Sequence, residues 1–172
     1  MKNLLWISVL AWAVVACNGS GSQANENVDD VEVADPNAAE QAQMDLRTSN
    51  RQRQYFIQGK KLYTMHCSSC HQTDGSGLAA LYPPLKGSNL LAGNEAWVAC
   101  GIKHGMKGPM EVNGVTFNQQ MAALGHLTNL EIAEIMTYVY TDFGPEERAF
   151  IDVKTVDDYL KACSGEMVTA PE

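Results

Sequence analysis

Two cysteines and a histidine stand close together in the run Cys67-Ser68-Ser69-Cys70-His71. This C-x-x-C-H spacing is the attachment signature of c-type haem. Two thiols three positions apart at the end of a helix can add to the two vinyl groups of one porphyrin, and the adjacent histidine then lies under the iron as its proximal ligand. The motif therefore predicts one haem c, bound covalently through Cys67 and Cys70, with His71 on the iron.

Two other uses of a C-x-x-C pair fit the surrounding sequence less well. A thioredoxin-like redox motif follows a strand and begins a helix, whereas a helix is expected before Cys67 and a glycine-rich loop after His71. A structural zinc site needs a second pair of ligands at short spacing, and Cys100 has no such neighbour. Haem attachment is therefore the favoured interpretation.

The N-terminus has the pattern of an export signal. A short positive head precedes an apolar stretch of 13 residues, Leu4 to Ala16, and the run Val14-Val15-Ala16-Cys17 resembles a bacterial lipobox. We expect residues 1–16 to be a signal peptide that is removed, and Cys17 to be lipidated. The alternative is an ordinary secretory signal in which Cys17 is incidental. Either way, the rest of the chain is expected outside the cytoplasm, and a lipid anchor would hold it on the periplasmic side of a bacterial membrane.

The overall charge argues against nucleic-acid binding. Twelve Lys and Arg stand against twenty Asp and Glu in 172 residues, a net charge of −8, whereas a nucleic-acid binder shows a basic face. Seven of the acids lie between Glu26 and Asp45 with no base among them. Residues 17–53 are also poor in large apolar side chains, so we predict a flexible acidic tether there. The alternative is an acidic helix from Asn37 to Arg53.

Residues 54–143 have the composition of a folded domain. Helices are expected over Gln54–His66, Glu95–His104 and Thr128–Phe143, with glycine- and proline-rich loops between them. Thr128 and Glu131 form a capping box at the start of the last of these helices. No strand signal is evident, so the predicted fold class is all-α. Residues 144–172 form a C-terminal extension that includes a further helix near Val156–Cys163.

This arrangement resembles the class I cytochrome c family over roughly Tyr55 to Phe143. The resemblance rests on the C-x-x-C-H motif and on the order of the features around it. It implies a mono-haem fold of a few helices and long loops, in which Gly59 lets the C-terminal helix approach the N-terminal one. It also implies that the Pro83 carbonyl accepts the Nδ1 hydrogen of His71. The residues that carry these features are Gly59, Tyr63, Pro83-Pro84-Leu85, Asn113–Met121, Ile135 and Tyr138.

The resemblance implies that Met121 supplies the distal ligand of the iron. Met121 follows the C-x-x-C-H motif by about fifty residues and leads into the last helix of the domain. Other residues could take this role, and a nitrogen ligand would give bis-histidine ligation. These alternatives are Met106, Met110, Met136, His104 and His126.

The two remaining cysteines, Cys100 and Cys163, form an even pair in a compartment expected to be oxidising. We predict a disulfide between them. Because Cys163 lies beyond the family's usual C-terminus, this bond would fix the extension to the helix that carries Trp97. The alternative is two free thiols.

The resemblance implies an electron carrier and not an enzyme. A di-haem peroxidase needs two attachment motifs, and this chain has one. We expect a membrane-tethered cytochrome that takes electrons from a quinol-oxidising complex and gives them to a terminal oxidase or reductase. The alternative is the haem-bearing subunit of a larger dehydrogenase, reductase or oxidase complex.

Overall fold

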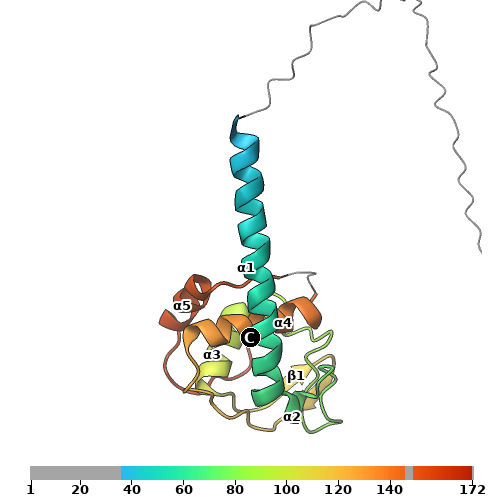
Figure 1. Ribbon diagram of the computed structural model, residues 1–172. Coiled ribbons are helices and arrows are strands. Elements are labelled where there is room, and N and C mark those ends of the chain that lie inside the picture. Colours follow the sequence, from blue (N-terminus) through green and yellow to red (C-terminus); the bar gives the residue numbers. More distant parts are fainter. Residues whose placement is uncertain (1–35, 146–148, 172) are drawn as a thin grey trace, which may run out of the picture. The chain divides into compact units, whose positions relative to one another are not determined.

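The computed structural model describes residues 36–145 and 149–171, and the predicted signal peptide and Cys17 lie outside this range. Five helices and one hairpin make up the described part (Figure 1). In chain order they are α1 (Pro36–His66), α2 (Ser68–His71), α3 (Glu95–His104), β1 (Met110–Val112), β2 (Val115–Phe117), α4 (Asn129–Asp142) and α5 (Val153–Lys161).

The predominantly helical fold confirms the predicted class, with one correction. The segment between α3 and α4 contains a small antiparallel hairpin that the sequence analysis missed, in which Val112 pairs with Val115 and Met110 with Phe117. Its turn is Asn113-Gly114, and both residues have positive φ, +52° and +80°. Asn-Gly is the preferred pair for a two-residue hairpin turn because it tolerates left-handed backbone. The side chain of Asn113 also donates to the Gly87 carbonyl at 3.1 Å.

The structure contradicts part of the predicted tether. Residues 36–53 are helical and belong to α1, which spans 31 residues and is therefore about 46 Å long. Proline is favoured in the first turn of a helix, and the segment that follows it is rich in good helix formers such as Ala, Gln and Arg. The acidic composition hid this propensity. Only residues up to 35 can belong to a tether, and they lie outside the described part of the chain.

The C-terminal extension packs against the middle of α1, which further explains why the helix continues there. Tyr55 meets the ring of Phe150 edge-on with centroids 5.2 Å apart. The guanidinium of Arg51 lies over the same ring at 5.3 Å and 3.4 Å from a carboxylate oxygen of Asp152. Because Arg51 is largely exposed, the ion pair itself contributes little, and the aromatic contact holds the segments together.

α1 and α4 cross at Gly59, as the resemblance implied. A Cβ atom at residue 59 would overlap the backbone carbonyl of Glu134 and lie 2.9 Å from the Cβ of Tyr138. Only glycine therefore allows the two helix backbones to come this close. Around the crossing, the ring of Tyr138 contacts those of Phe56 and Tyr63, each with centroids 5.3 Å apart. The core of the domain is centred on this crossing.

The start of α4 has the predicted capping box. The Glu131 N–H donates to the Thr128 hydroxyl at 3.2 Å, and the Thr128 N–H donates to a Glu131 carboxylate oxygen at 2.8 Å. These bonds satisfy two backbone donors that the helix leaves free. Hydrogen bonds from the Thr128 N–H and hydroxyl also lower the pKa of the Glu131 carboxyl, because they favour its charged form. The cap fixes the point where the loop that contains Met121 ends.

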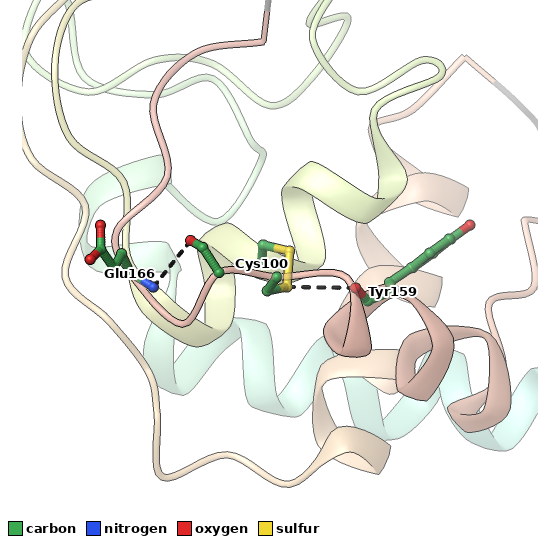
Figure 2. Close-up of a disulfide and its surroundings, with 5 residues drawn as sticks. Cys100, Tyr159 and Glu166 are labelled. Atoms are coloured by element: carbon green, nitrogen blue, oxygen red, sulfur yellow. Dashed lines mark hydrogen bonds between the residues drawn. A yellow bond between two sulfur atoms is a disulfide. The ribbon is translucent and has the colours of Figure 1, made fainter.

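A disulfide joins Cys100 in α3 to Cys163, just beyond α5 (Figure 2). This is the pairing that the sequence predicts. The two cysteines are 63 residues apart, and in the chain-entropy model closing a loop of this size contributes roughly 4 kcal/mol. α5 has a buried Val156 and a hydrogen bond of 2.6 Å between Asn129 and Asp157, so part of its attachment does not depend on the disulfide.

Candidate functional site

A largely apolar cavity of about 350 Å³ lies between the helices. The end of α1, both α3 and α4, and the loops on either side of them supply its walls. The aliphatic lining from the helices and loops includes Leu85, Leu90, Leu91, Val98, Ile102, Leu124, Ile135 and Val139. A cavity of this kind can exclude water from a flat apolar ligand.

The C-x-x-C-H motif lies on one wall of the cavity. The N–H of Cys67 donates to the Tyr63 carbonyl at 2.8 Å, and the N–H of His71 donates to the Cys67 carbonyl at 2.9 Å. This continuous helical path brings Cys67, Cys70 and His71 to the same cavity. The two thiols are not joined to each other. Both are therefore free to react with a bound group.

The electrostatic environment of Cys67 favours the neutral thiol. Burial raises the pKa of Cys67 to about 12, and the neighbouring Cys70 contributes to the same shift. A metal site would require thiolates. Within residues 36–145 and 149–171, no group of three or more His, Cys, Asp or Glu side chains could hold a metal ion. The geometry therefore disfavours the zinc alternative.

His71 is oriented by the loop that follows it. Its Nδ1 lies 3.0 Å from the carbonyl oxygen of Pro83. A carbonyl can only accept, so Nδ1 must carry the proton, and Nε2 keeps its lone pair. Burial also lowers the pKa of His71, which favours the neutral imidazole. His71 is thus prepared to coordinate a metal through Nε2.

Glycine at position 77 allows the loop to carry Pro83 to this place. The N–H of Gly77 donates to the His71 carbonyl at 3.0 Å. Gly77 has φ +71°, and a Cβ there would meet the carbonyls of Tyr82 and Pro83. No other residue fits this backbone conformation and close approach together. The Pro83 carbonyl is therefore positioned by the chain on both sides of it.

Four methionines line the cavity, which narrows the alternatives for a distal ligand without reducing them to one. They are Met106, Met110, Met121 and Met136. His104 and His126 are not among the lining residues. Instead, the ring of His126 lies against that of His66, with centroids 5.4 Å apart. Among the candidates, the cavity geometry therefore favours a thioether over an imidazole.

Met121 differs from the other three methionines in its surroundings. Met136 is fully buried in α4, and Met106 and Met110 belong to a buried cluster with Val112 and Phe117. Met121 is only partly buried and packs against this cluster and the main core. Its backbone pairs with Met106 through two hydrogen bonds of 3.0 Å.

Trp97 is a lining residue that the sequence analysis did not assign to the site. It packs between the two buried clusters, and its Nε1–H donates to the Thr169 carbonyl at 2.6 Å. The spacing of Trp97, Val98 and Ile102 on one helix predicted an apolar face. Nothing in the sequence indicated that this face meets the C-terminal tail.

These residues fit a c-type haem. Two free thiols and a neutral imidazole meet at the wall of an apolar cavity, and a thioether is available from the chain that closes it. The thiols can form thioether bonds to the two vinyl groups, and the imidazole Nε2 can ligate the iron. A bound haem supplies an iron that gains or loses one electron.

Comparison with known proteins identifies the class that this fold and site define. The cytochrome c family model matches residues 56–141. Cytochrome c-552 of Thermus thermophilus is 31% identical over 94 residues, which cover 52% of this chain and 71% of that protein. A second cytochrome c-552, from another strain of the same species, is also 31% identical over 94 residues, and the match covers 63% of it.

The chain belongs to the cytochrome c family and is a class I, mono-haem member. Its cofactor is one covalently bound haem c with iron. The family places it among the electron-transfer haem proteins, which are in general carriers and not enzymes.

Proposed function

We propose that this cytochrome is a membrane-tethered carrier that moves single electrons in a respiratory chain outside the cytoplasm, and that it has no enzymatic activity. His71 and Met121 are the axial ligands of its haem. The observation that carries the proposal is the cavity that has Cys67, Cys70 and His71 on its walls together with Met121. Its donors and acceptors are a quinol-oxidising complex and a terminal oxidase or reductase.

Methionine ligation suits a carrier on the oxidising side of a respiratory chain. A thioether favours Fe(II) over Fe(III) more than a second imidazole does, so it raises the midpoint potential. The exclusion of His104 and His126 from the cavity lining supports this choice. The apolar lining acts in the same direction, because a low dielectric disfavours the additional charge of the ferric haem.

The rim around Met121 supports docking through apolar contact. Residues 112–127 contain no Asp, Glu, Lys or Arg. Gln119, Gln120 and Ala122 line the cavity and are also exposed, so they lie where the cavity meets the surface. Exposed Val115 adds an apolar side chain to the same segment. A neutral rim provides little long-range steering of a charged partner.

Electron transfer to this cytochrome from the solubilised quinol-oxidising complex of the same organism is therefore expected to depend weakly on salt. We expect the second-order rate to change less than about threefold between low and moderate ionic strength. Stopped-flow reduction of the haem measures this rate. The matched variant Gln120→Lys, which adds a charge to the rim, should make the salt dependence steeper. A steep fall in the unmodified protein would mean that lysines elsewhere carry the docking, and no transfer at all would contradict the proposed donor.

A lipid at Cys17 provides the proposed attachment to the membrane. None of the helices in the described residues is long and apolar enough to cross a membrane. The lipobox-like run that ends at Cys17 supports an acyl anchor instead, and each buried methylene of the acyl chains contributes about 0.8 kcal/mol. The proposed location is the periplasmic side of a bacterial membrane.

The anchor is tested by partitioning between detergent and water. The unmodified protein, expressed in a bacterium that processes lipoproteins, is expected in the detergent phase, because several acyl chains make the attachment stable. Cys17→Ser should remain unprocessed or appear in the aqueous phase. A matched Asn18→Ser variant should behave like the unmodified protein. Equal partitioning of Cys17→Ser and the unmodified protein would contradict lipidation at this residue.

A further inference from the structure

The tail that follows α5 returns to the site and pairs with the chain beside it. The N–H of Val168 donates to the Gly105 carbonyl at 3.0 Å, and the N–H of Lys107 donates to the Val168 carbonyl at 2.9 Å. Val168 and Met106 thus form a parallel bridge. The side chains of Val168 and Ala170 are partly buried against the cluster that contains Met106. The tail is therefore part of the folded domain.

The opposite edge of the same short segment pairs with Met121. The N–H and carbonyl of Met106 bond to Met121, whereas the flanking Gly105 and Lys107 bond to Val168. Successive residues of an extended chain direct their hydrogen-bonding groups to opposite sides. Residue 106 therefore lies between Val168 and Met121, and the tail supports the backbone of Met121 through one intervening segment.

Three further contacts hold the tail near the cavity. The Trp97 indole donates to Thr169, and the amide nitrogen of Gln120 lies 3.5 Å from the sulfur of Met167. The disulfide fixes the start of the tail at Cys163. Figure 2 shows the bond from Cys100 to the turn after α5, from which the chain runs on toward Glu166. Both Trp97 and Gln120 line the cavity.

We propose that the C-terminal tail Met167–Thr169 is a positioning segment that holds the Met121 backbone against the cavity and so keeps Met121 on the haem iron. The inference rests on the proposed ligation by Met121. It assigns a role in the haem site to an extension that lies beyond the cytochrome c match, which ends at residue 141.

An added ligand such as imidazole can reach the iron only when Met121 has left it. The apparent affinity for imidazole is therefore its intrinsic affinity multiplied by the fraction of molecules whose distal position is open. A segment that holds Met121 in place lowers this fraction. Weakening the tail should raise the apparent affinity, and this change is a direct measure of positioning.

The experiment compares Val168→Pro with Val168→Ala in the full-length holoprotein. Proline removes the N–H that donates to Gly105, whereas alanine keeps both backbone bonds. Spectrophotometric titration with imidazole should give an affinity roughly fivefold higher for Val168→Pro, the factor expected from one backbone hydrogen bond. Val168→Ala should stay close to the unmodified protein. Hydrogen exchange of the Met121 amide should be faster in the proline variant by a similar factor.

A control separates positioning from general loss of stability. Thr141→Val removes a hydrogen bond of 3.0 Å from α4 to Ala149, at the other end of the extension. It should lower the melting temperature without changing imidazole affinity. If Val168→Pro does not fold, the double variant Cys100→Ser/Cys163→Ser releases the start of the tail and should raise imidazole affinity in the same direction.

Two results would overturn the proposal in different ways. Equal imidazole affinities for Val168→Pro and Val168→Ala, with equal Met121 exchange, would show that the tail does not position the ligand. For the double serine variant, an unchanged affinity would have the same meaning. If the unmodified ferric protein lacks the far-red absorption band of methionine ligation, the assignment of Met121 fails, and the tail proposal fails with it.

Discussion

The double variant Cys67→Ala/Cys70→Ala is expected to lose covalently bound haem completely. Both thiols lie on the wall of the cavity, and neither is joined to another cysteine. Removing them leaves His71 as the proximal attachment, and a single axial bond does not retain haem in denaturing solvent. The measurement is acid–acetone extraction of protein produced in a host with haem-maturation machinery, followed by the absorbance of the protein pellet.

The other two cysteines provide a matched control for this prediction. Cys100 and Cys163 are joined to each other, and neither lines the cavity. Cys100→Ser/Cys163→Ser should therefore keep haem through the extraction as well as the unmodified protein does. If haem is freely extracted from the unmodified protein, or if the Cys67→Ala/Cys70→Ala protein retains it, the covalent site is wrongly assigned.

Local features of the sequence were sufficient to predict the motif and the helices around it. The capping box at Thr128, the glycine at the crossing of α1 and α4, and the histidine–proline pair all depend on short-range patterns or on the family's spacing. Such features are visible in sequence because one or two residues have no substitute there. Gly59 is the clearest case, since any Cβ would overlap the backbone of α4.

The errors arose where tertiary packing or a single turn determines the structure. The helix over residues 36–53 was missed because composition was weighed over helix propensity and because the contact with Phe150 comes from a distant part of the chain. The hairpin was missed although Asn113-Gly114 is a strong turn signal, since its strands have only three residues each. The pairing of Val168 with Met106 has no local signature at all.

The distal ligand is the part of the site that the sequence resolved least, and the structure explains why. Four methionines reach the same cavity, so the residue type alone cannot identify the ligand. The surrounding contacts separate them: Met110 and Met136 are packed into buried clusters, whereas Met121 is partly buried on a loop. A ligand must be able to direct its sulfur to the iron without leaving a cavity in the core, which favours Met121.

Met121→His is expected to lower the midpoint potential by on the order of 100 mV, because imidazole stabilises Fe(III) relative to Fe(II) more than a thioether does. Met121→Ala should abolish the weak far-red absorption band of the ferric protein. Potentiometric titration gives the first result and absorption spectroscopy the second. Both variants should keep the covalent haem, since Cys67 and Cys70 are unchanged.

Met110→Leu is the matched control, because it replaces another cavity methionine with a side chain of similar volume. It should keep the far-red band and change the potential much less than Met121→His does. Met110 is 8% exposed in the strand β1, and its partner across the hairpin is Phe117. Loss of the band in Met110→Leu, with the band intact in Met121→Ala, would show that the hairpin supplies the ligand. In that case the Met121 loop would only close the cavity, and the proposed axial pair would have to be His71 and Met110.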